Sequence, residues 1–286
     1  MEGSILRRVA ILIHERDQFE STGYFLFHMA SLWREQGMQI VIVRGTGKPV
    51  DADIAILHVD LTIVPRSYRR YLRTFPRTLN SAVTDISKRH VSRHLVHPGD
   101  GYAGPVIVKT DRNSGGTREA GLRKQGVLAR RLSRKVFARL PWTFRSTLPS
   151  HDYHVFESRK QVPAAIWLNP RIVVERFLPE RSGEFYCLRT WTFLGEKETN
   201  SLSYAREPVV KSTNVVRRDV VVEIPEELRR MRLDLGFDYG KFDYAVSNGE
   251  VVLYDANRTP AFGGLSTSVS SASVRLLAEG LESFLA

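Results

Sequence analysis

The first third of the chain alternates between runs of consecutive apolar residues and segments in which apolar residues recur at helical spacing. Strand-length apolar runs occur at residues 7–14, 38–45 and 51–60, and helical periodicity occurs at residues 19–36 and 65–76. Strands and helices in this order are typical of a parallel sheet covered by helices. The pattern therefore predicts an α/β N-terminal segment, with a boundary near residue 80.

The rest of the chain has a different pattern, in which short strand candidates follow one another with fewer helices between them. The predicted strands are residues 104–110, 153–156, 172–178, 184–193, 241–247 and 251–257. A terminal helix is predicted for residues 274–285, where apolar side chains recur at helical spacing. Because several of these strands look like antiparallel neighbours, we expect α+β architecture after the α/β segment.

Composition narrows the class of protein without naming a partner. The 286 residues include 42 Lys and Arg against 31 Asp and Glu, which gives a formal charge of +11 and favours anionic partners. No apolar run approaches the roughly 20 residues that cross a bilayer, and residues 1–17 read as a first strand, not a secretion signal. Zinc-finger spacing and an aromatic RNA-binding signature are absent from the sequence. The single cysteine, Cys187, cannot form an internal disulfide, so we expect a cytoplasmic setting.

Basic residues concentrate in one segment between the two parts. Residues 118–145 hold nine Lys or Arg and one acid, Glu119. Apolar residues recur there at helical spacing, at Leu128, Leu132, Val136 and Leu140. The pattern is compatible with a solvated helix that packs along one edge, with a groove for an anionic ligand, or with a contact to a membrane surface.

Two lysines lie where phosphate groups are often bound. Lys109 ends an apolar strand and precedes a glycine-containing loop with Ser114, Gly115 and Gly116, whose backbone N–H groups could approach phosphate oxygens closely. Lys88 opens a helical segment and is a second candidate. The competing interpretation of Lys109 is a strand-end lysine that simply reaches solvent before a turn.

The strand at residues 172–178 ends in a segment suited to hydrogen bonding with a ring and a sugar. Glu175 could accept a proton from an exocyclic amine, and the backbone of Arg176, Phe177 and Leu178 could contact the edge of a ring. Glu184, nine residues further, could accept hydrogen bonds from ribose hydroxyls. The alternative is a surface loop with exposed acids.

The last two strands form a predicted hairpin with an Asn248–Gly249 turn signal. Asp255 and Asn257 lie two residues apart and share one face, and Asp243 lies on the other arm. A strict two-residue turn would pair Asp243 with Tyr254, whereas a three-residue loop would pair it with Asp255. In the second case three oxygen-bearing side chains share one face and suit Mg²⁺. Alternatively, Asp255 and Asn257 only begin a turn.

Taken in order along residues 85–262, these features resemble the ATP-grasp ligases, a superfamily that includes D-alanine–D-alanine ligase, glutathione synthetase and the ribosomal-protein glutamate ligase. The resemblance implies a Rossmann-like pre-ATP-grasp domain at residues 1–84 and an ATP-grasp domain at 85–286. In the latter, residues 85–178 would be a central lobe with a phosphate lid, and 179–286 a C-terminal lobe with the metal site.

The resemblance also implies cofactors and site residues. ATP would be bound by Lys88, Lys109, Ser114, Gly115, Gly116, Glu175, Arg176, Phe177, Leu178 and Glu184. Mg²⁺ or Mn²⁺ would be bound by Asp243, Asp255 and Asn257. Lys241, Arg189 and Arg258 would be catalytic. The chain departs from the family at Asp255, where a glutamate is usual, and in the basic segment 118–145.

The resulting hypothesis is an ATP-dependent ligase that joins a carboxylate to an amine or a thiol through an acylphosphate. Its substrates would be small molecules or peptides. Two alternatives remain open from the sequence: an ATP-grasp-type small-molecule kinase, and a non-catalytic basic adaptor that binds nucleotides or anions.

Overall fold

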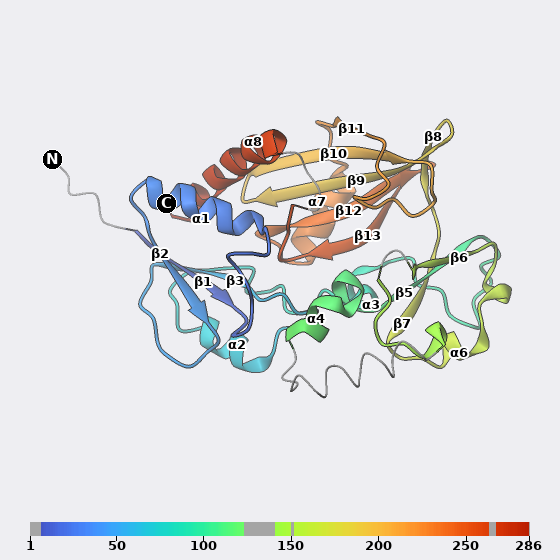
Figure 1. The fold of residues 1–286 in the computed structure, drawn as a ribbon, viewed down its shortest axis with the longest axis horizontal. Helices are drawn as coiled ribbons and strands as arrows, with labels where there is room; N and C mark the ends of the chain where they lie inside the picture. Colours follow the sequence, from blue (N-terminus) through green and yellow to red (C-terminus); the bar gives the residue numbers. More distant parts are fainter. Residues whose placement is uncertain (1–6, 123–140, 150–151, 263–266, 286) are drawn as a thin grey trace.

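The computed structural model describes residues 7–122, 141–149, 152–262 and 267–285. Three β-sheets form the body of the protein (Figure 1). They are a four-stranded sheet, a three-stranded sheet and a six-stranded sheet. Each sheet is built from a separate stretch of the chain.

The N-terminal sheet is parallel and has the strand order β2-β1-β3-β4. Its strands are β1 (Arg8–Ile13), β2 (Gln39–Arg44), β3 (Ile54–His58) and β4 (Thr78–Leu79), connected through α1 (Phe25–Glu35) and α2 (Arg66–Leu72). β1 and β3 are buried almost throughout, which explains their continuous apolar sequence. Helix α1 ends because Gly37 adopts a positive φ of 88° and its amide closes the last turn onto Arg34.

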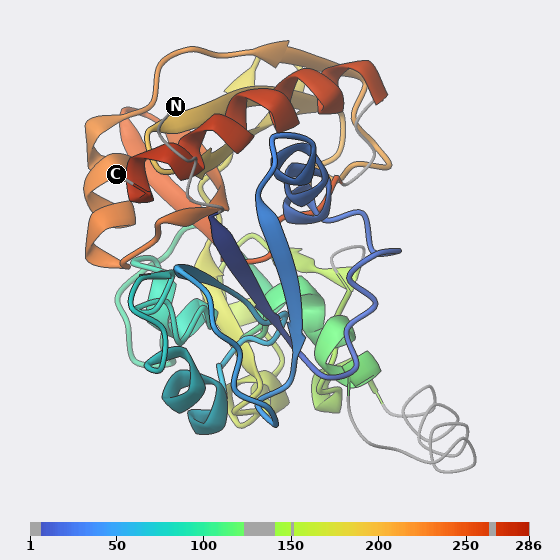
Figure 2. The same ribbon diagram turned by 90° about the vertical axis from the view of Figure 1, so that its left-hand side faces the viewer.

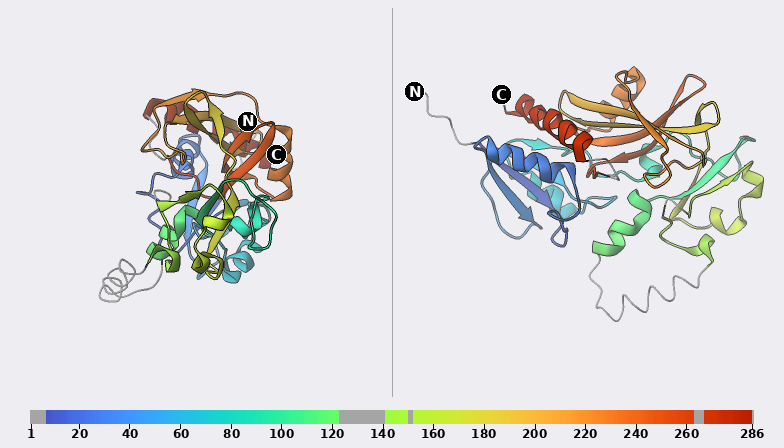
Figure 3. Two further views of the ribbon diagram at one scale, coloured as in Figure 1. Left: turned by 90° about the vertical axis from the view of Figure 1, so that its right-hand side faces the viewer. Right: turned by 45° about the horizontal axis from the view of Figure 1, so that its top comes forward.

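The three-stranded sheet is antiparallel, with the order β6-β5-β7. Its strands are β5 (Val106–Thr110), β6 (His154–Phe156) and β7 (Ile172–Arg176). The short helices of this part are α3 (Lys88–Val91), η1 (Asn113–Gly116), α4 (Thr117–Leu122), η2 (Trp142–Phe144), η4 (Arg159–Gln161) and α6 (Ala164–Trp167). Figure 3 shows this sheet set apart from the six-stranded one, which the chain enters after β7.

The six-stranded sheet has the order β11-β10-β9-β12-β13, and β8 pairs with β9. Its strands are β8 (Glu180–Ser182), β9 (Phe185–Leu194), β10 (Lys197–Ala205), β11 (Arg217–Val220), β12 (Tyr239–Ser247) and β13 (Glu250–Asn257). One face carries Trp191, Phe193 and Phe242, which pack against α7 (Glu226–Asp234). The other face packs against α8 (Thr267–Ala278) around Leu194 and forms the floor of the cleft described below.

The C-terminal helix returns to the N-terminal sheet. Helix α8 (Thr267–Ala278), continued by η5 (Glu279–Phe284), lies against α1 (Figure 2). The indole N–H of Trp33 in α1 donates to the carbonyl of Ala278 at 2.9 Å. This packing joins the first and last elements of the chain in one apolar core.

A polar contact also joins the N-terminal sheet to the six-stranded sheet. Oδ1 of Asn80 accepts hydrogen bonds from the backbone amides of Asp238 and Tyr239, both at 3.0 Å. Its Nδ2 donates to the Tyr239 carbonyl at 2.7 Å. Asn80 is fully buried and has a positive φ of 60°. It therefore satisfies backbone groups that would otherwise be buried without partners.

The predicted strands agree with the structure, but several other predictions do not. The helix predicted for residues 19–36 begins only at Phe25, because residues 18–22 form a turn in which Thr22 donates to the Gln18 carbonyl. β10, β11 and α7 were not predicted. The basic segment 118–145 falls largely on residues 123–140, which lie outside the described residues. In the part of the chain that the structure describes, no helix is both long and apolar enough to span a membrane.

Candidate functional site

The last hairpin pairs Asp243 with Asp255, and a β-bulge makes that pairing possible. The turn is the strict two-residue form: Ser247 pairs with Glu250, and Asn248 and Gly249 have φ values of 51° and 83°. The register then shifts between Tyr244, which pairs with Leu253, and Asp243, which pairs with Asp255. The expected pairing is confirmed, but the expected three-residue loop is wrong, because Tyr254 is the extra residue.

The bulge has a second consequence, because it turns two successive side chains toward the same side. Tyr254 and Asp255 both line one cleft, whereas Leu253 and Ala256 face the core beneath the sheet. The Tyr254 hydroxyl donates to the Leu178 carbonyl at 2.7 Å, and its ring lies 5.1 Å from Nζ of Lys109. Burial, with the Glu175 and Glu180 carboxylates, raises the pKa of Tyr254.

Each of the two aspartates is paired with a lysine in the cleft. Nζ of Lys88 lies 2.9 Å from Oδ1 of Asp255, and Nζ of Lys241 lies 2.9 Å from Oδ2 of Asp243. Burial lowers the pKa of Lys88, but the Asp255 carboxylate outweighs it and the net pKa is raised. The same balance of burial against Asp243 raises the pKa of Lys241. Both ammonium groups are therefore held in the charged form.

Asn257 is fixed at the end of β13 by a local turn. Its Oδ1 accepts from the amide of Thr259 at 2.9 Å, from the Thr259 hydroxyl at 3.2 Å and from Nδ2 of Asn113 at 3.3 Å. Asp243 is held from the neighbouring strand by the Thr190 hydroxyl, 3.0 Å from Oδ1. The three predicted metal ligands thus line the same cleft.

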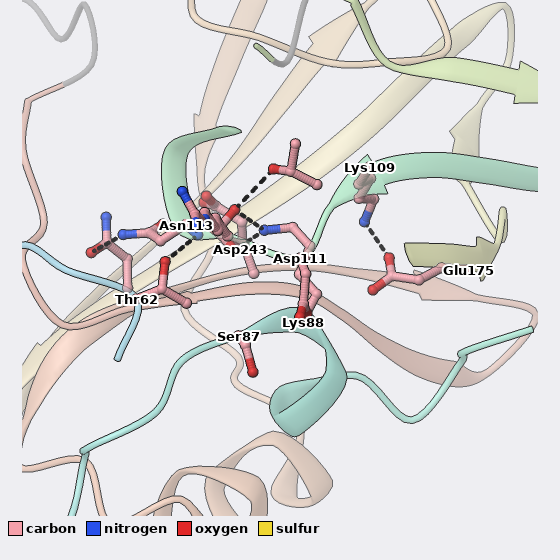
Figure 4. A network of polar contacts seen from close by, with 12 residues as sticks. Thr62, Ser87, Lys88, Lys109, Asp111, Asn113, Glu175 and Asp243 are labelled. Atoms are coloured by element: carbon pink, nitrogen blue, oxygen red, sulfur yellow. Dashed lines mark hydrogen bonds and ion pairs between the residues drawn. The ribbon is translucent and has the colours of Figure 1, made fainter. Parts of the chain in front are cut away.

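Lys109 and Glu175 form a buried pair across the three-stranded sheet (Figure 4). Nζ of Lys109 lies 2.5 Å from Oε2 of Glu175, and both side chains are at most 5% exposed. Lys109 pairs with Val173 and Glu175 with Ile107, so the two side chains are diagonal neighbours on one face. Oε1 of Glu175 is buried without a hydrogen-bond partner among the described residues. Glu175 is not among the residues that line the cleft, so a bound group would reach this oxygen only if a neighbouring side chain moved.

The loop after β5 has an unusual backbone conformation. Ser114, Gly115 and Gly116 have successive positive φ values of 48°, 63° and 75°. A Cβ on Gly115 would lie 2.5 Å from the carbonyl oxygen of Leu148, so glycine is required there. Ser114 and Gly115 line the cleft. The base of the loop is anchored by the amide of Asn113, which donates to the Thr62 hydroxyl at 3.0 Å (Figure 4).

Tyr153 also lines this end of the cleft and was not predicted from the sequence. Burial is the largest cause of a raised pKa for its phenol, to which the nearby Asp255 and Glu175 add and which Lys88 opposes. Tyr153 therefore lies near Lys88, Asp255 and Glu175. Tyr153 precedes β6 directly, and in the sequence it is only an aromatic residue at the end of a strand. Nothing in the sequence pattern indicated that it lines a site.

The cleft has a volume of about 1210 Å³ and lies over the polar face of the six-stranded sheet. At one end are Lys88, Lys109 and Phe177, and at the other are β10 and β11. Hydroxyl side chains form much of the floor between the two ends: Thr190, Thr192, Thr199, Ser201 and Ser203. Thr190 and Thr192 lie in a predicted strand but were not singled out, and Thr199, Ser201 and Ser203 lie in β10, whose largely polar sequence was not predicted as a strand.

Two of the three predicted catalytic residues face elsewhere. Arg189 lies on the opposite face of β9, where its guanidinium forms a bidentate pair with Glu180 at 2.8 Å. Arg258 is fully buried and donates to the carbonyls of Val59, Leu61 and Val83. Burial lowers the pKa of Arg258 to about 10. Neither side chain is among the residues that line the cleft, so the structure does not bring these two arginines together with the other predicted site residues.

Several predicted nucleotide contacts are also engaged elsewhere. Glu184 is 59% exposed and pairs with Arg206 at 2.8 Å, away from the cleft. The Arg176 guanidinium lies 5.0 Å from the centre of the Tyr102 ring. The amide of Phe177 donates to the Pro105 carbonyl at 2.8 Å, and the Leu178 carbonyl accepts from Tyr254. Phe177 reaches the cleft with its ring instead, and Gly116 packs against residues 146–147.

The described residues contain no cluster of three or more His, Cys, Asp or Glu side chains arranged to hold a metal ion. The set at the end of the hairpin consists of two carboxylates and one amide oxygen, which are ligands that Mg²⁺ accepts together with phosphate oxygens and water. The arrangement is therefore suited to a divalent cation that is held jointly by the chain and a phosphate-bearing ligand.

No family model matches the sequence, and a comparison with curated proteins finds no significant match. Comparison with solved structures does find similar folds. The macrocyclase MdnC from Microcystis aeruginosa, bound with its precursor peptide MdnA, matches with a TM-score of 0.50 at 11% identity over 95% of this chain and 99% of that one.

Two other solved structures match over 98% of this chain. A RimK domain ATP-grasp protein from Sphaerobacter thermophilus has a TM-score of 0.49 at 14% identity and is covered over 100% of its length. D-alanine–D-alanine ligase from Bacillus anthracis has a TM-score of 0.49 at 12% identity and is covered over 96%. At these identities the similarity concerns the fold alone. The chain has the ATP-grasp fold.

Proposed function

We propose that the protein is an ATP-dependent ligase that joins a carboxylate to an amine or a thiol through an acylphosphate. One observation carries the proposal: the bulge at Tyr254 brings Asp243 and Asp255 into one cleft with Lys88 and Lys241. The fold supports the same class of activity, because its structural neighbours include ligases. The lysines would offset phosphate charge, and the carboxylates would share a metal ion with the phosphates.

Asp243, Asp255 and Asn257 fit Mg²⁺ or Mn²⁺ by the chemistry of their donor atoms. Two carboxylates and an amide oxygen form an oxygen-only set, and hard divalent cations prefer oxygen. Oδ1 of Asp255 accepts a hydrogen bond from Lys88. The Asp255 side chain is 25% exposed, so the carboxylate remains accessible from the cleft. When bound, the metal would neutralise charge on the phosphates of ATP.

The chain's own residues would act by alignment and by charge neutralisation. Lys88 and Lys109 would contact phosphate oxygens, with Ser114 and Gly115 covering them from the loop after β5. Lys241 would face the phosphoryl group in transfer. A substrate carboxylate oxygen would attack the γ-phosphorus, and the bond from that phosphorus to the bridging oxygen would break to release ADP. The amine would then attack the acyl carbon, lose a proton and displace phosphate.

The base of the nucleotide would lie between the two lobes. If a neighbouring side chain moved, the unpaired Oε1 of Glu175 could accept from an exocyclic amine, and the rings of Phe177 and Tyr254 would flank the base. This proposal keeps Glu175 from the sequence hypothesis and replaces the backbone contacts of Phe177 by its ring. No ribose contact is proposed for Glu184.

We also propose the domain division that the sequence suggested. Residues 1–84 would form the pre-ATP-grasp domain, 85–178 the central lobe and 179–286 the C-terminal lobe. The strands of the three sheets fall within these three ranges, which supports the division. Helix α8 packs across it onto α1.

The substrates would be small-molecule or peptide carboxylates with an amine partner. The similarity to a macrocyclase bound with a precursor peptide supports peptides as one class. The test is to incubate the purified protein with MgATP, hydroxylamine and pooled amino acids and peptides. A ligase would form ADP, phosphate and a hydroxamate from the trapped acylphosphate.

The two alternatives give different products in the same assay. A kinase would transfer the labelled γ-phosphate of ATP to a hydroxyl group of an acceptor. Hydroxylamine would not release the phosphate from such an ester. A nucleotide-binding adaptor would bind ATP but form no ADP with any pool. Either result, obtained with protein that binds MgATP, would contradict the ligase proposal.

A further inference from the structure

The floor of the cleft extends well beyond the charged end, in a single row across the sheet. The cross-strand register aligns one residue from each strand, and the row runs through Asp255, Asp243, Thr190, Ser201 and Val220. Four strand spacings separate β13 from β11, which is about 19 Å. The cleft volume of about 1210 Å³ also exceeds the roughly 300–1,000 Å³ that is usual for a small-molecule pocket. Room therefore remains for an acceptor that is larger than an amino acid.

Strand β11 ends this row and has a free edge among the described residues. The amide of Val221 donates to the Asn200 carbonyl of β10. Because the direction of backbone groups alternates along a strand, the amides and carbonyls of Arg218 and Val220 point away from β10. An unpaired row of this kind is a template for another strand.

β11 and the residues that flank it carry three exposed valines and one arginine at alternate positions. Val216, Val220 and Val222 are 59%, 85% and 90% exposed. Arg218 lies among them, and its Nε donates to the Ser203 hydroxyl at 3.0 Å. Exposed valines at alternate positions are typical of a surface that a second extended chain covers.

The charge around this edge is predominantly positive. Lys211, Arg217 and Arg218 all line the cleft. Arg217, on the opposite face of β11 from Arg218, lies 3.8 Å from the centre of the Tyr204 ring and pairs with Asp219 at 3.3 Å. Lys241, at the charged end of the cleft, lines the same cleft as Arg218, so the positive side chains of the edge and of the charged end face one continuous space.

We propose that the free edge of β11 binds an acidic peptide segment in an extended conformation, as an added strand. Outward backbone groups of Arg218 and Val220 pair with the peptide backbone, the valines contact its apolar side chains, and Arg218 binds a carboxylate. The inference rests on the proposed function in one respect, because the bound peptide would be the carboxylate substrate of the proposed ligase. Binding at the edge does not require turnover.

The test measures fluorescence anisotropy of a labelled peptide of about eight alternating Glu and Val residues. Two variants remove separate contacts: Arg218→Ala removes the guanidinium, and Val220→Pro removes an outward amide. Proline is tolerated at an edge position whose N–H faces solvent. The matched controls are Arg230→Ala, an exposed arginine on α7, and Val220→Thr, which retains the amide.

We expect Arg218→Ala and Val220→Pro each to weaken peptide binding by about tenfold or more, and the controls to change it by no more than about twofold. The same peptide with N-methyl groups on alternate residues lacks backbone N–H donors, and its binding should weaken as more of these donors are removed. MgATP affinity, measured by calorimetry, should be unchanged in all four variants. Circular dichroism confirms that each variant is folded.

The outcomes separate the inference from the proposed function. Equal peptide binding by Arg218→Ala and the wild type, or by methylated and unmethylated peptide, would overturn the inference. Intact MgATP binding with no peptide binding would overturn it too, while leaving the ligase proposal standing. Edge-dependent peptide binding by a protein that never binds MgATP would support the inference and reject the proposed function.

Discussion

Replacing Asp255 by asparagine tests the charge balance of the cleft, because it keeps the shape and removes the charge. Lys88 is 4% exposed, and its ammonium contacts Oδ1 of Asp255 at 2.9 Å and the Arg112 carbonyl at 3.2 Å. In Asp255→Asn the amide oxygen can still accept a hydrogen bond. The buried ammonium then has no carboxylate in direct contact.

The magnitude follows from the burial of the pair. Removing one partner of a fully buried ion pair costs about 3–5 kcal/mol. Here the Asp255 side chain is 25% exposed, and Lys88 keeps a carbonyl and an amide oxygen as acceptors. We therefore expect Asp255→Asn to lower the free energy of unfolding at neutral pH by about 2–3 kcal/mol.

The pH dependence should reverse between the two proteins. In the wild type, the pKa of Lys88 is raised above its ordinary value of 10.5. Its stabilising contribution is therefore complete below pH 10.5 and is lost as pH rises through the folded pKa. In Asp255→Asn, burial becomes dominant and the pKa of Lys88 falls below 10.5. The unfolded state then binds more protons, so the variant gains stability as pH rises toward 10.5.

Urea unfolding followed by circular dichroism, at a series of pH values, measures both effects. Asp234→Asn is a matched control, because Asp234 is 67% exposed and its contact with Arg93 is 3.5 Å long. We expect the control to differ from the wild type by less than about 1 kcal/mol. If Asp255→Asn were as stable as the control, or if its loss of stability did not shrink with rising pH, Asp255 would not compensate the buried charge of Lys88.

Three further predictions concern other parts of the structure. Asn80→Ala should lower the free energy of unfolding by about 2–4 kcal/mol in urea titration, because it leaves the buried backbone of Tyr239 without its partner. Burial, reinforced by a neighbouring carboxylate, raises the pKa of Asp17 to about 6, so stability is lost as pH rises from its ordinary value through 6. Asp17→Asn should then be more stable than the wild type at pH 7 by about 1–3 kcal/mol and lack that pH dependence; a flat wild-type profile would contradict this. Gly115→Ala places a Cβ 2.5 Å from the Leu148 carbonyl oxygen and should weaken ATP binding in calorimetry by about tenfold, given a strain of roughly 1–3 kcal/mol; unchanged affinity would show that the loop takes no part in binding.

Most strand positions could be predicted because those strands carry an apolar run, whereas the largely polar strands β10 and β11 could not. The pairing of Asp243 with Asp255 could be proposed as one of two registers, but the mechanism could not. A bulge depends on how the tertiary structure uses an extra residue, and the Tyr254 hydroxyl finds its acceptor on Leu178, which is distant in sequence. Local pattern contains no information about that contact.

The two arginines that lie outside the cleft have a physical reason in common. Arg189 lies on a strand between two residues that do line the cleft, Leu188 and Thr190, so only the pleat decides its side. Arg258 follows the metal-ligand candidates directly and is nonetheless buried against the carbonyls of Val59, Leu61 and Val83, which are distant in sequence. Charged side chains can serve either as site residues or as contacts that hold distant segments of the chain together. Sequence spacing alone does not separate these uses.

Titration of Mn²⁺ into the protein with ATP, with free Mn²⁺ followed by electron paramagnetic resonance, tests whether the last hairpin binds the metal ion. The wild type and Asp234→Asn should bind one ion per chain only when ATP is present. A variant that combines Asp243→Asn with Asp255→Asn, and that is folded by circular dichroism, should lose that ion. If the double variant bound Mn²⁺ with ATP as tightly as the wild type, the hairpin would not be the metal site.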